Sequence, residues 1–586
     1  MEKNAFLMLD GKAILWLNDR VCETSSDLLS SEHFRRFFNR SLNELIQKKS
    51  RLLQIFGSET ISDENKKCLL RTLSFLAQLP AEHVQKVVEG SEVFFQDKIL
   101  LNEFVEFLYN NWRHLKRLVI SQAARDDDFD VRPYRTFNRT IEHLTGLIRN
   151  NYRDIQENIT GQYPRIYRQV SAGAEVAAIT GFPAISLPQP YRERLDGIPF
   201  IHQVLIYPPL IFNSPFNKRN GEFERVNFNP IDSLSFGKNW LCYPARVGSL
   251  LIFVYFPIEL FELNFSLCNL FELASPGECS CQPDAVLVFG AETRGLPGDY
   301  RSRTFFYDDL ENEMTIGVVP AGDEFSYFGY LKKMMLTLHN IRMMKMGRLP
   351  FHGAMFRLTT SDQQPKTILL MGDTGTGKSE TLEAMRSIGS KEIEDLVIIA
   401  DDMGSLELTP EGKIIGYGTE TGAFVRLDDL QPGYAFGQMD RAVIMNPNQV
   451  NARVVIPVTT YNNITRGFQI DYVLYANNYE AVNDPAKTIL PFLSKEEALQ
   501  VFRQGRSMSK GTTTSTGITE AYFANVFGPS QYQDLHEGLA VRYFGEFIKQ
   551  GIFVGQMYTQ LGVNSREKVG PELAAKALLK LIRKAK

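Results

Sequence analysis

Cysteine is scarce in this chain of 586 residues. The few that occur are irregularly spaced, at Cys22, Cys68, Cys242, Cys268, Cys279 and Cys281. A small scaffold stapled by disulfides needs a much higher density of cysteine, so the composition excludes that class. The pair in Cys279-Ser-Cys281 has no second pair to complete a zinc site, and we expect a loop with two reduced thiols there.

Long apolar runs are also missing. The most apolar stretch, residues 249–261, contains a proline and a glutamate and is too short to span a bilayer. We interpret it as a buried strand. The N-terminal residues M-E-K-N-A-F-L-M-L-D-G-K lack the apolar run of a signal peptide. The sequence therefore predicts a cytoplasmic protein with no membrane partner.

A large excess of charge of either sign is absent too. The chain has 64 Lys and Arg against 68 Asp and Glu, a formal net charge of −4. Proteins that bind nucleic acid over a large surface carry a marked positive excess, so we expect no nucleic-acid partner. Basic residues gather only at 576–586, which we expect to be the exposed end of a terminal helix.

The character of the sequence changes along the chain. Residues 30–160 show apolar residues at helical spacing, interrupted by the acidic segment 126–130, which we interpret as a solvated loop. We expect three parts: a helical N-terminal extension over 1–165, a β-rich N-lobe over 166–325 and a C-lobe over 326–586. The predicted strands lie at 174–180, 200–207, 249–256, 285–290, 352–358, 366–371, 396–400, 453–458 and 472–476, and a helix is predicted at 330–345.

The clearest chemical motif is M-G-D-T-G-T-G-K-S-E-T at residues 371–381, between a predicted strand at 366–371 and a predicted helix at 379–388. In a P-loop of this kind, glycines let backbone N–H groups approach a phosphate, and the helix N-terminus adds a positive dipole end. Lys378 is expected to reach the β- and γ-phosphates of ATP, and Ser379 to bind Mg²⁺. The residues expected to cradle the nucleotide are Gly372, Asp373, Thr374, Gly375, Thr376, Gly377, Lys378 and Ser379.

A second motif follows at the end of the apolar segment V-I-I-A, where Asp401 and Asp402 stand side by side. A carboxylate at the carboxyl end of a strand next to a P-loop holds the metal of the bound nucleotide, directly or through water. We expect this pair to hold the metal, and Asp401 to belong to the catalytic group.

These motifs resemble those of two related families. The segments G-K-S-E-T (377–381), I-A-D-D (399–402) and F-H-G-A (351–354) are similar to bacterial HPr kinase/phosphorylase. Residues 310–550 resemble the ATP-type phosphoenolpyruvate carboxykinases over a longer stretch. The resemblance implies an α/β fold of mixed α+β character, in which two lobes enclose the site and the C-lobe carries the P-loop, with the helical N-terminal region as an addition.

The carboxykinase resemblance implies roles for further residues. The segment Y-F-G-Y-L-K-K-M-M (327–335) matches the stretch whose second lysine is a metal ligand, which points to Lys333. His352 and Asp402 match the other two ligands, so the resemblance implies an Mn²⁺ site made by these three side chains. A lysine binds a metal only after it loses a proton, and a nearby cation would lower its pKa accordingly.

The same resemblance extends further along the chain. The segment N-A-R-V-V-I-P-V (451–458) implies that Arg453 contacts the γ-phosphate and the transferred group, and Arg426 matches a lysine near the phosphates. The region bordering the adenine matches G-I-T-E at 517–520, which adds Gly517, Ile518 and Thr519 to the nucleotide site.

The chain departs from the family in the part that binds the organic acid. Phe182, in I-T-G-F-P-A, stands where the family has an arginine, and Thr516 replaces another arginine before G-I-T-E. A carboxylate acceptor needs cations. The arginines left nearby in the sequence are Arg192, Arg194, Arg294, Arg301 and Arg303.

The sequence thus predicts an ATP-dependent phosphotransferase that uses Mg²⁺ and Mn²⁺, with a carboxykinase-type reaction on oxaloacetate as the first hypothesis. Three alternatives stay open: a kinase of another small molecule, a protein kinase of the HPr type, and a non-catalytic nucleotide-binding protein. In the last case the N-terminal helices are the candidate surface for a protein partner.

Overall fold

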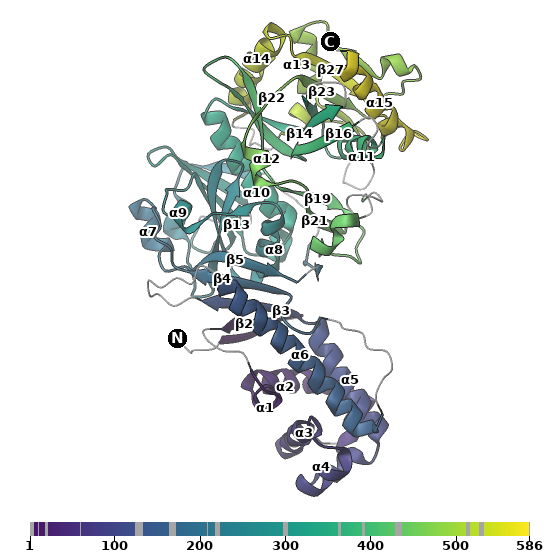
Figure 1. The fold of residues 1–586 in the computed structure, drawn as a ribbon. Helices are drawn as coiled ribbons and strands as arrows, with labels where there is room; N and C mark the ends of the chain where they lie inside the picture. Colours follow the sequence, from purple (N-terminus) through teal and green to yellow (C-terminus); the bar gives the residue numbers. More distant parts are fainter. Residues whose placement is uncertain are drawn as a thin grey trace. The chain divides into compact units, whose positions relative to one another are not determined.

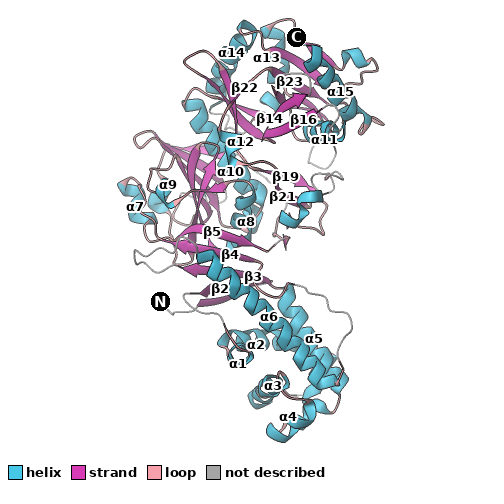
Figure 2. Cartoon of the chain, in the orientation of Figure 1, coloured by secondary structure: helices cyan, strands magenta, loops and turns pink. Residues whose placement is uncertain are grey.

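A computed structural model describes most of the chain (Figure 1). The described residues are 5–9, 11–17, 22–58, 60–122, 133–162, 171–207, 209–216, 223–296, 300, 303–360, 365–388, 393–427, 430, 436–510, 516–526 and 532–584. The structure is mixed α/β with large sheets, as the sequence predicts (Figure 2). It forms two units: Met1–Gly181 with His202–Tyr207, and Phe182–Ile201 with Pro208–Lys586.

The first unit combines helices with a sheet. Its helices are α1 (Ser25–Ser30), α2 (Glu32–Gln47), α3 (Asp63–Leu76), α4 (Ala81–Val87), α5 (Lys98–His114) and α6 (Pro133–Thr160). Its strands follow the order β1 (Ala5–Leu9), β2 (Lys12–Leu17), β3 (Lys116–Gln122), β4 (Val176–Gly181) and β5 (Phe200–Ile206, whose first two residues belong to the second unit). Strands β1 and β2 are antiparallel, and β2, β3 and β4 are parallel.

The strands β1, β2 and β3 correct the prediction that residues 1–165 are helical. Each strand is short, and strand formation depends on partners that are distant in the sequence, so no helical or alternating period identifies it locally. Because β4 pairs with β3, this unit also extends beyond the boundary predicted at residue 165.

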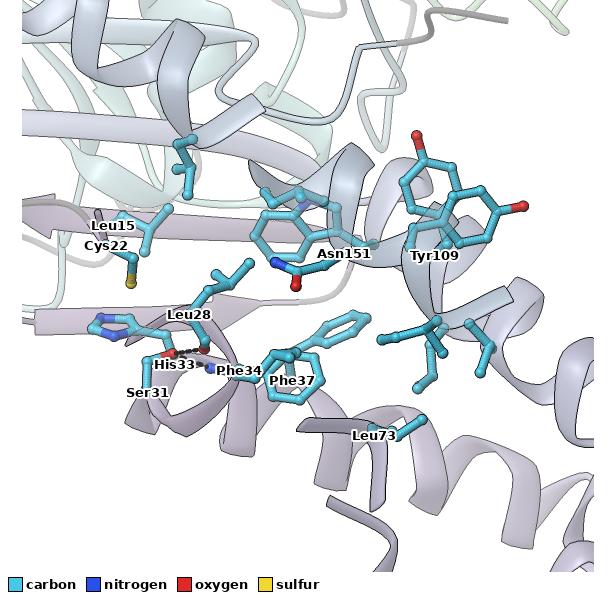
Figure 3. Close-up of a pocket in the computed structure, with 18 residues that line it drawn as sticks. Leu15, Cys22, Leu28, Ser31, His33, Phe34, Phe37, Leu73, Tyr109 and Asn151 are labelled. Carbon is cyan, nitrogen blue, oxygen red and sulfur yellow. Dashed lines mark hydrogen bonds between the residues drawn. The ribbon is translucent and has the colours of Figure 1, made fainter. Parts of the chain in front are cut away.

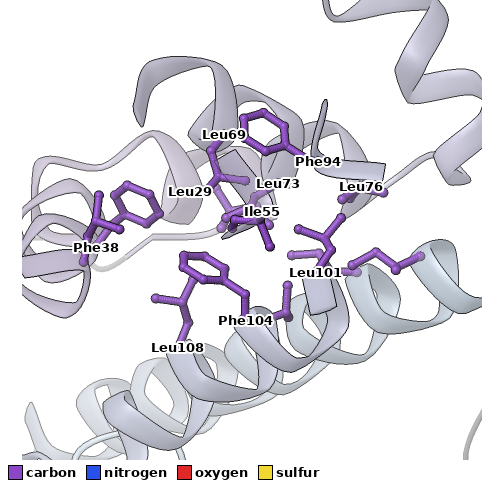
Figure 4. Packing of buried hydrophobic residues seen from close by; sticks show 14 of the residues in the cluster. Leu29, Phe38, Ile55, Leu69, Leu73, Leu76, Phe94, Leu101, Phe104 and Leu108 are labelled. Carbon is purple, nitrogen blue, oxygen red and sulfur yellow. The ribbon is translucent and has the colours of Figure 1, made fainter. Parts of the chain in front are cut away.

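The helices of the first unit enclose an apolar core (Figure 4). Phe38 of α2 and Phe104 of α5 are fully buried, with their ring centroids 6.4 Å apart. Leu69 and Leu73 of α3 close the same cluster, one helical turn apart. Hydroxyl and carboxylate side chains stabilise the helix starts: Ser31 caps α2, Ser62 caps α3 and Asp97 caps α5.

The second unit contains most of the residues predicted to form the N-lobe and the C-lobe, and it is a single unit. One sheet has the order β8 (Trp240–Val247), β9 (Leu250–Pro257), β11 (Ala285–Ala291), β13 (Met314–Pro320), β12 (Thr304–Asp309) and β7 (Phe223–Val226). Nearly every residue of β9 and β11 is buried, which explains their continuous apolar sequence. The helix α10 (Phe328–Lys345) contacts β11 and β13 and is itself buried on almost all sides.

A second sheet positions the predicted site. Its order is β22 (Phe468–Gln469), β18 (Ile414–Gly418), β17 (Met403–Leu408), β14 (Leu349–Thr360), β15 (Lys366–Met371), β23 (Tyr472–Asn477), β27 (Phe553–Tyr558) and β24 (Ile489–Pro491), and β16 (Ile393–Ala400) also pairs with β14. Since β14 is antiparallel to both β15 and β16, those two strands run in the same direction. Their carboxyl ends therefore meet at the edge where β14 begins.

The last helix differs from expectation. The sequence predicts that residues 576–586 are the exposed end of a terminal helix, but one face of α15 (Val569–Lys584) is buried against α11 (Lys378–Ile388) and the second sheet. The buried face carries Ala574, Ala575, Leu578, Leu579 and Ile582. The lysines between these residues disguise the apolar period, because they occupy the opposite face of the same helix.

Two smaller sheets complete the second unit. One has the order β19 (Gly422–Arg426), β21 (Arg453–Pro457), β20 (Val443–Met445) and β6 (Leu210–Phe212). The other is a hairpin of β25 (Arg506–Lys510) and β26 (Thr516–Glu520). The helices that follow β22 in the chain include α13 (Lys495–Gln504) and α14 (Gln533–Lys549).

Several local predictions are confirmed. The strands predicted at 174–180, 200–207, 249–256, 285–290 and 366–371 correspond to β4, β5, β9, β11 and β15, and the predicted helix at 330–345 is α10. The six cysteines are free thiols. The acidic segment 126–130 lies outside the described residues. No helix in the described part of the chain combines the length and the apolar character needed to cross a membrane.

Candidate functional site

The loop between β15 and α11 has the geometry that its sequence predicts. Gly375 and Gly377 have φ angles of +78° and +92°, which residues with a side chain rarely adopt. At Gly377 an added Cβ would also lie 2.8 Å from Thr559 Cβ, too close for any other residue. Within the loop, Thr376 Oγ1 donates to the Asp373 carbonyl at 2.6 Å. The turn is therefore compact, and it leads directly into the N-terminus of α11.

Lys378, the first residue of α11, folds back over this loop. Its Nζ donates to the carbonyl oxygens of Gly372, at 2.6 Å, and Asp373, at 2.9 Å. The side chain is 6% exposed. An ammonium group in this position lies above the loop whose N–H groups are expected to bind phosphate. Ser379 follows it and is exposed in the first turn of the helix.

Two residues that the sequence did not indicate hold the loop in place. Asn478 Nδ2 donates to Gly375 O at 2.9 Å, and Thr559 Oγ1 donates to Thr376 O at 2.6 Å. Asn478 also bonds both backbone groups of Met508, on β25. Asn478 follows β23, the neighbour of β15, and Thr559 follows β27, the next strand of the sheet, so only the sheet order brings them to the loop.

The bonds of Asn478 tie the hairpin of β25 and β26 to the phosphate loop. This hairpin carries the predicted adenine-site residues Gly517, Ile518 and Thr519 on β26. Ile518 is 55% exposed, and Ser507 Oγ lies 3.3 Å from Thr519 Oγ1 across the two strands. An exposed apolar side chain beside a P-loop is compatible with stacking on a base. Contact with adenine itself stays a prediction.

The acidic pair lies where the sequence predicts, directly after β16. The Asp402 carbonyl accepts from Gly353 N at 2.9 Å, and the His352 carbonyl accepts from Gly372 N at 3.2 Å. The start of β14 thus bridges the acidic pair and the phosphate loop. His352 is 1% exposed, and its Nε2 lies 2.9 Å from Asp402 Oδ1, so the structure brings these two predicted ligands into contact.

The lysine seen in contact with this pair is Lys332, whereas the resemblance implied its neighbour Lys333. Lys332 Nζ donates to Asp402 Oδ2 at 2.8 Å and lies 3.2 Å from Glu420 Oε1. Successive residues of a helix are turned by about 100°, so only one of two neighbouring lysines can face a given carboxylate. Lys333 is partly exposed at the next position of α10. Its role as a metal ligand stays a prediction without support from this contact.

Glu420 is a further member of the site that the sequence did not indicate. It is 1% exposed, and both of its carboxyl oxygens are buried without an aligned hydrogen-bond donor. Burial raises its pKa to about 8, although Lys332 pulls in the opposite direction. Its place between two β-strands, in the segment G-T-E-T-G, carried no recognisable sequence signal.

The charged groups of the site shift one another's pKa values. Burial alone would raise the pKa of Asp402, but Lys332 and His352 outweigh it and hold that pKa well below its usual range. Burial, with the adjacent negative charge of Asp402, raises the pKa of Asp401 to about 6. Burial would also lower the pKa of Lys332, yet Asp402 and Glu420 together raise it. The lysine is therefore a firmly protonated cation.

The predicted arginines lie together on the β19–β21 sheet. Arg426 and Arg453 are directly opposite in the antiparallel pair, so their side chains share one face. The guanidinium of Arg453 lies 5.4 Å from the ring centroid of Phe424, and Lys332 Nζ lies 5.9 Å from the same ring. The ring of Phe424 thus links Arg453 to the lysine that contacts Asp402. Arg453 Nε is buried without a hydrogen-bond partner.

The site offers ligands for the predicted Mg²⁺. Mg²⁺ bound with a nucleotide keeps several waters and needs only one or two protein carboxylates, which Asp401 and Asp402 can supply together with the Ser379 hydroxyl. Of the three Mn²⁺ ligands implied by the resemblance, His352 and Asp402 are in contact, and the second ring nitrogen of His352 lies against Ala524 O.

In the part of the chain that the structure describes, no three His, Cys, Asp or Glu side chains form a candidate metal site. The implied Mn²⁺ site contains only two side chains of these types, His352 and Asp402, so Mn²⁺ binding stays a prediction.

The arginines considered for an organic acid have other partners or are exposed. Arg303 pairs with Glu224 at 3.0 Å, and Arg194 donates to the Asp232 carbonyl at 2.6 Å. Arg192 and Arg294 are exposed, and Arg301 lies outside the described residues. Phe182 is partly buried at the start of the second unit. None of these observations places an arginine where the family has one and this chain has Phe182.

Neither known protein-family models nor curated protein sequences match this chain. The proposal for its function therefore depends on the motifs and on the geometry of the site.

Proposed function

We propose that this protein is an ATP-dependent phosphotransferase whose second unit has a fold of the phosphoenolpyruvate carboxykinase kind. The observation that supports this most directly is the edge of the second sheet. There the phosphate loop after β15, the acidic pair after β16 and His352 at the start of β14 are linked by backbone hydrogen bonds. In this proposal the sheet of β8–β13 is the N-lobe, and the P-loop sheet is the C-lobe.

The residues of the loop have distinct tasks in the proposed reaction. Backbone N–H groups of residues 374–378 bind the phosphates, and Lys378 moves from its own carbonyl partners to the β- and γ-phosphate oxygens. Arg453 and Arg426 stabilise negative charge that spreads over the transferred phosphoryl group. Mg²⁺, held by Ser379 and the acidic pair, neutralises phosphate charge when it is bound.

Lys332 has the task that the structure itself suggests. As a cation it keeps Asp402 ionised and orients its carboxylate. It also lies 3.2 Å from Glu420, whose carboxyl oxygens are otherwise buried without a partner. This role differs from that of a lysine that binds a metal through a neutral amine, and the two roles can be separated by mutation.

Replacing Lys332 by methionine is expected to lower the rate of phosphoryl transfer by about 100-fold, a typical cost for one group that orients charge at a reacting centre. The matched control is Lys333→Met, the next residue on the same helix, which should change the rate less than about threefold. Turnover is measured as ADP release, with circular dichroism to confirm that both variants fold. A larger loss in Lys333→Met than in Lys332→Met would favour the metal-ligand role implied by the resemblance.

The acceptor follows from the cations near the γ-phosphate. Lys332, Arg426 and Arg453 suit an anionic acceptor, so the first candidate is a dicarboxylate in a carboxykinase-type reaction that converts oxaloacetate and ATP into phosphoenolpyruvate, CO₂ and ADP. The second candidate is another small molecule. It is favoured by Phe182, because an apolar ring cannot pair with a carboxylate, and an unpaired charge in a closed site costs several kcal/mol.

A coupled assay with the purified protein decides between these acceptors. The carboxykinase-type reaction predicts phosphoenolpyruvate formed from oxaloacetate in an ATP- and Mg²⁺-dependent manner, and a rate at least about 100-fold lower in Arg453→Met. Tight ATP binding without this product would exclude oxaloacetate and leave another acceptor. Failure to bind ATP at millimolar concentration, by calorimetry, would contradict the proposed function as a whole.

A further inference from the structure

The first unit contains a cavity of about 180 Å³ between its helices and β2 (Figure 3). One wall comes from α2 and the residues before it, including Leu28, Phe34 and Phe37. A second wall comes from α5, including Leu108. The third comes from α6, including Leu144. The lining is almost wholly apolar, and the cavity is larger than one of about 150 Å³ that holds a benzene molecule.

One polar atom in this lining has no partner. Asn151, on α6, is 4% exposed, and its Oδ1 is buried without a hydrogen-bond donor. The orientation of the amide is determined by its other end, because Nδ2 donates to the Leu147 carbonyl at 3.0 Å and only the nitrogen can do so. In Figure 3 the Asn151 amide lies among the side chains that line the cavity. The cavity thus presents a hydrogen-bond acceptor in apolar surroundings.

Three of the other polar side chains in the wall are used within the protein. Ser31 Oγ donates to the Leu28 carbonyl at 2.7 Å and accepts from Phe34 N. Trp112 Nε1 donates to the Ala172 carbonyl at 2.7 Å, and Tyr152 OH donates to Glu106. A buried water molecule needs two to four polar partners, and Asn151 Oδ1 offers one. An apolar molecule that donates one hydrogen bond satisfies this site better than water does.

The cavity is also accessible. The burial of its lining changes from one side to the other: Asn151 and Phe37 are buried, whereas Cys22, Leu28 and His33 are partly exposed. A molecule can therefore enter past the partly exposed residues and reach the amide at the buried side.

We propose that this cavity is a binding site for a flat, apolar small molecule of one or two fused rings that donates a hydrogen bond to Asn151 Oδ1. The aromatic side chains Phe34, Phe37 and Trp112 contact its faces and edges. The site lies wholly in the first unit and involves none of the residues of the phosphate loop, so it is independent of the proposed phosphotransferase function.

Indole and benzofuran test the proposal, because they share their shape and only indole has an N–H donor. Calorimetric titration of the full-length protein should show binding of both, with indole about tenfold tighter, as one buried hydrogen bond provides. No binding of either compound up to its solubility limit would overturn the proposal, as would equal affinities.

Two variants locate the binding. Asn151→Leu has a similar volume and no acceptor, so the preference for indole should disappear while benzofuran binds as before. Leu144→Trp places a large ring in the cavity from a partly buried position, and should abolish binding of both compounds. A preference that survives Asn151→Leu, or binding that survives in a folded Leu144→Trp, would place the ligand elsewhere and overturn the proposal. If Leu144→Trp does not fold, as judged by circular dichroism, Asn151→Leu decides alone.

Discussion

Replacing Lys378 by alanine is expected to lower phosphoryl transfer by on the order of 1,000-fold. The ammonium of Lys378 lies over the phosphate loop, 2.6 Å from the Gly372 carbonyl. Loss of a charge-assisted hydrogen bond also weakens binding of ATP and Mg²⁺, by about 1.5–3 kcal/mol. Turnover measures the first effect, and isothermal titration measures the second.

The control for this prediction is Lys366→Ala. Lys366 begins β15, at the end of the strand remote from the loop, and pairs with Asp471 at 3.1 Å. The Lys366→Ala variant removes one lysine from β15, the strand that leads into the loop, and should leave both turnover and ATP affinity nearly unchanged. Because Lys378 donates only to loop carbonyls in the free protein, Lys378→Ala should still fold. Unaltered turnover in Lys378→Ala would contradict the assignment of the phosphate site.

Arg117→Met is expected to lower the free energy of unfolding of the first unit by about 3–5 kcal/mol, the usual cost of removing one partner from a buried charged network. The Arg117 side chain is 2% exposed, and it holds several backbone carbonyls at once. Its Nη1 donates to Arg113 O at 2.6 Å and to Trp112 O at 3.0 Å, two carbonyls at the end of α5.

The same guanidinium ties α5 to the segment before β4. Arg117 Nε donates to Gly173 O at 2.6 Å, and Nη2 lies 3.6 Å from Glu175 Oε1. Methionine fills a similar volume but leaves these carbonyls buried without donors, so the loss comes from unsatisfied polar groups rather than from a cavity. Urea denaturation, monitored by the fluorescence of Trp112, measures the change in the first unit.

Lys116→Met is the matched control, since Lys116 is the preceding residue, is 24% exposed and lies 4.0 Å from the same Glu175. An ion pair of this kind contributes less than about 1 kcal/mol. A loss below about 1 kcal/mol in Arg117→Met, equal to that of the control, would show that the network does not stabilise this unit.

Much of the proposed nucleotide site could be predicted because its backbone depends on local sequence. A strand, a glycine-rich turn and a helix follow one another within residues 366–388, and each has its own signal: an apolar β-branched run, glycines with positive φ, and a helical apolar period. Asp401 and Asp402 were predictable for the same reason, since they directly follow an apolar strand. The two motifs lie close together because β15 and β16 both pair with β14, and the family resemblance implied this closeness.

The remainder of the site could not be predicted from the sequence. Lys332 and Lys333 are chemically identical neighbours, and only the rotation of α10 against the second sheet decides which one meets Asp402. Asn478, Thr559 and Glu420 come from separate segments whose local sequence carries no signal. Asn478 and Thr559 reach the loop because of the order of β15, β23 and β27 in the sheet. Glu420 reaches the site because the segment after β18 lies beside Lys332 of α10.

The sequence by itself determined the glycine-rich loop, the acidic pair and several strands and helices of the second unit, among them β9, β11, β15 and α10, because these depend on residue type and on spacing over a few turns. The tertiary structure alone decided that β1, β2 and β3 form a sheet in the N-terminal region, which lysine joins the site, and that α6 encloses an apolar cavity around Asn151. The physical reason is that strand pairing, helix rotation and cavity shape arise from contacts between residues far apart in the chain, and these contacts leave no periodic pattern in any one segment.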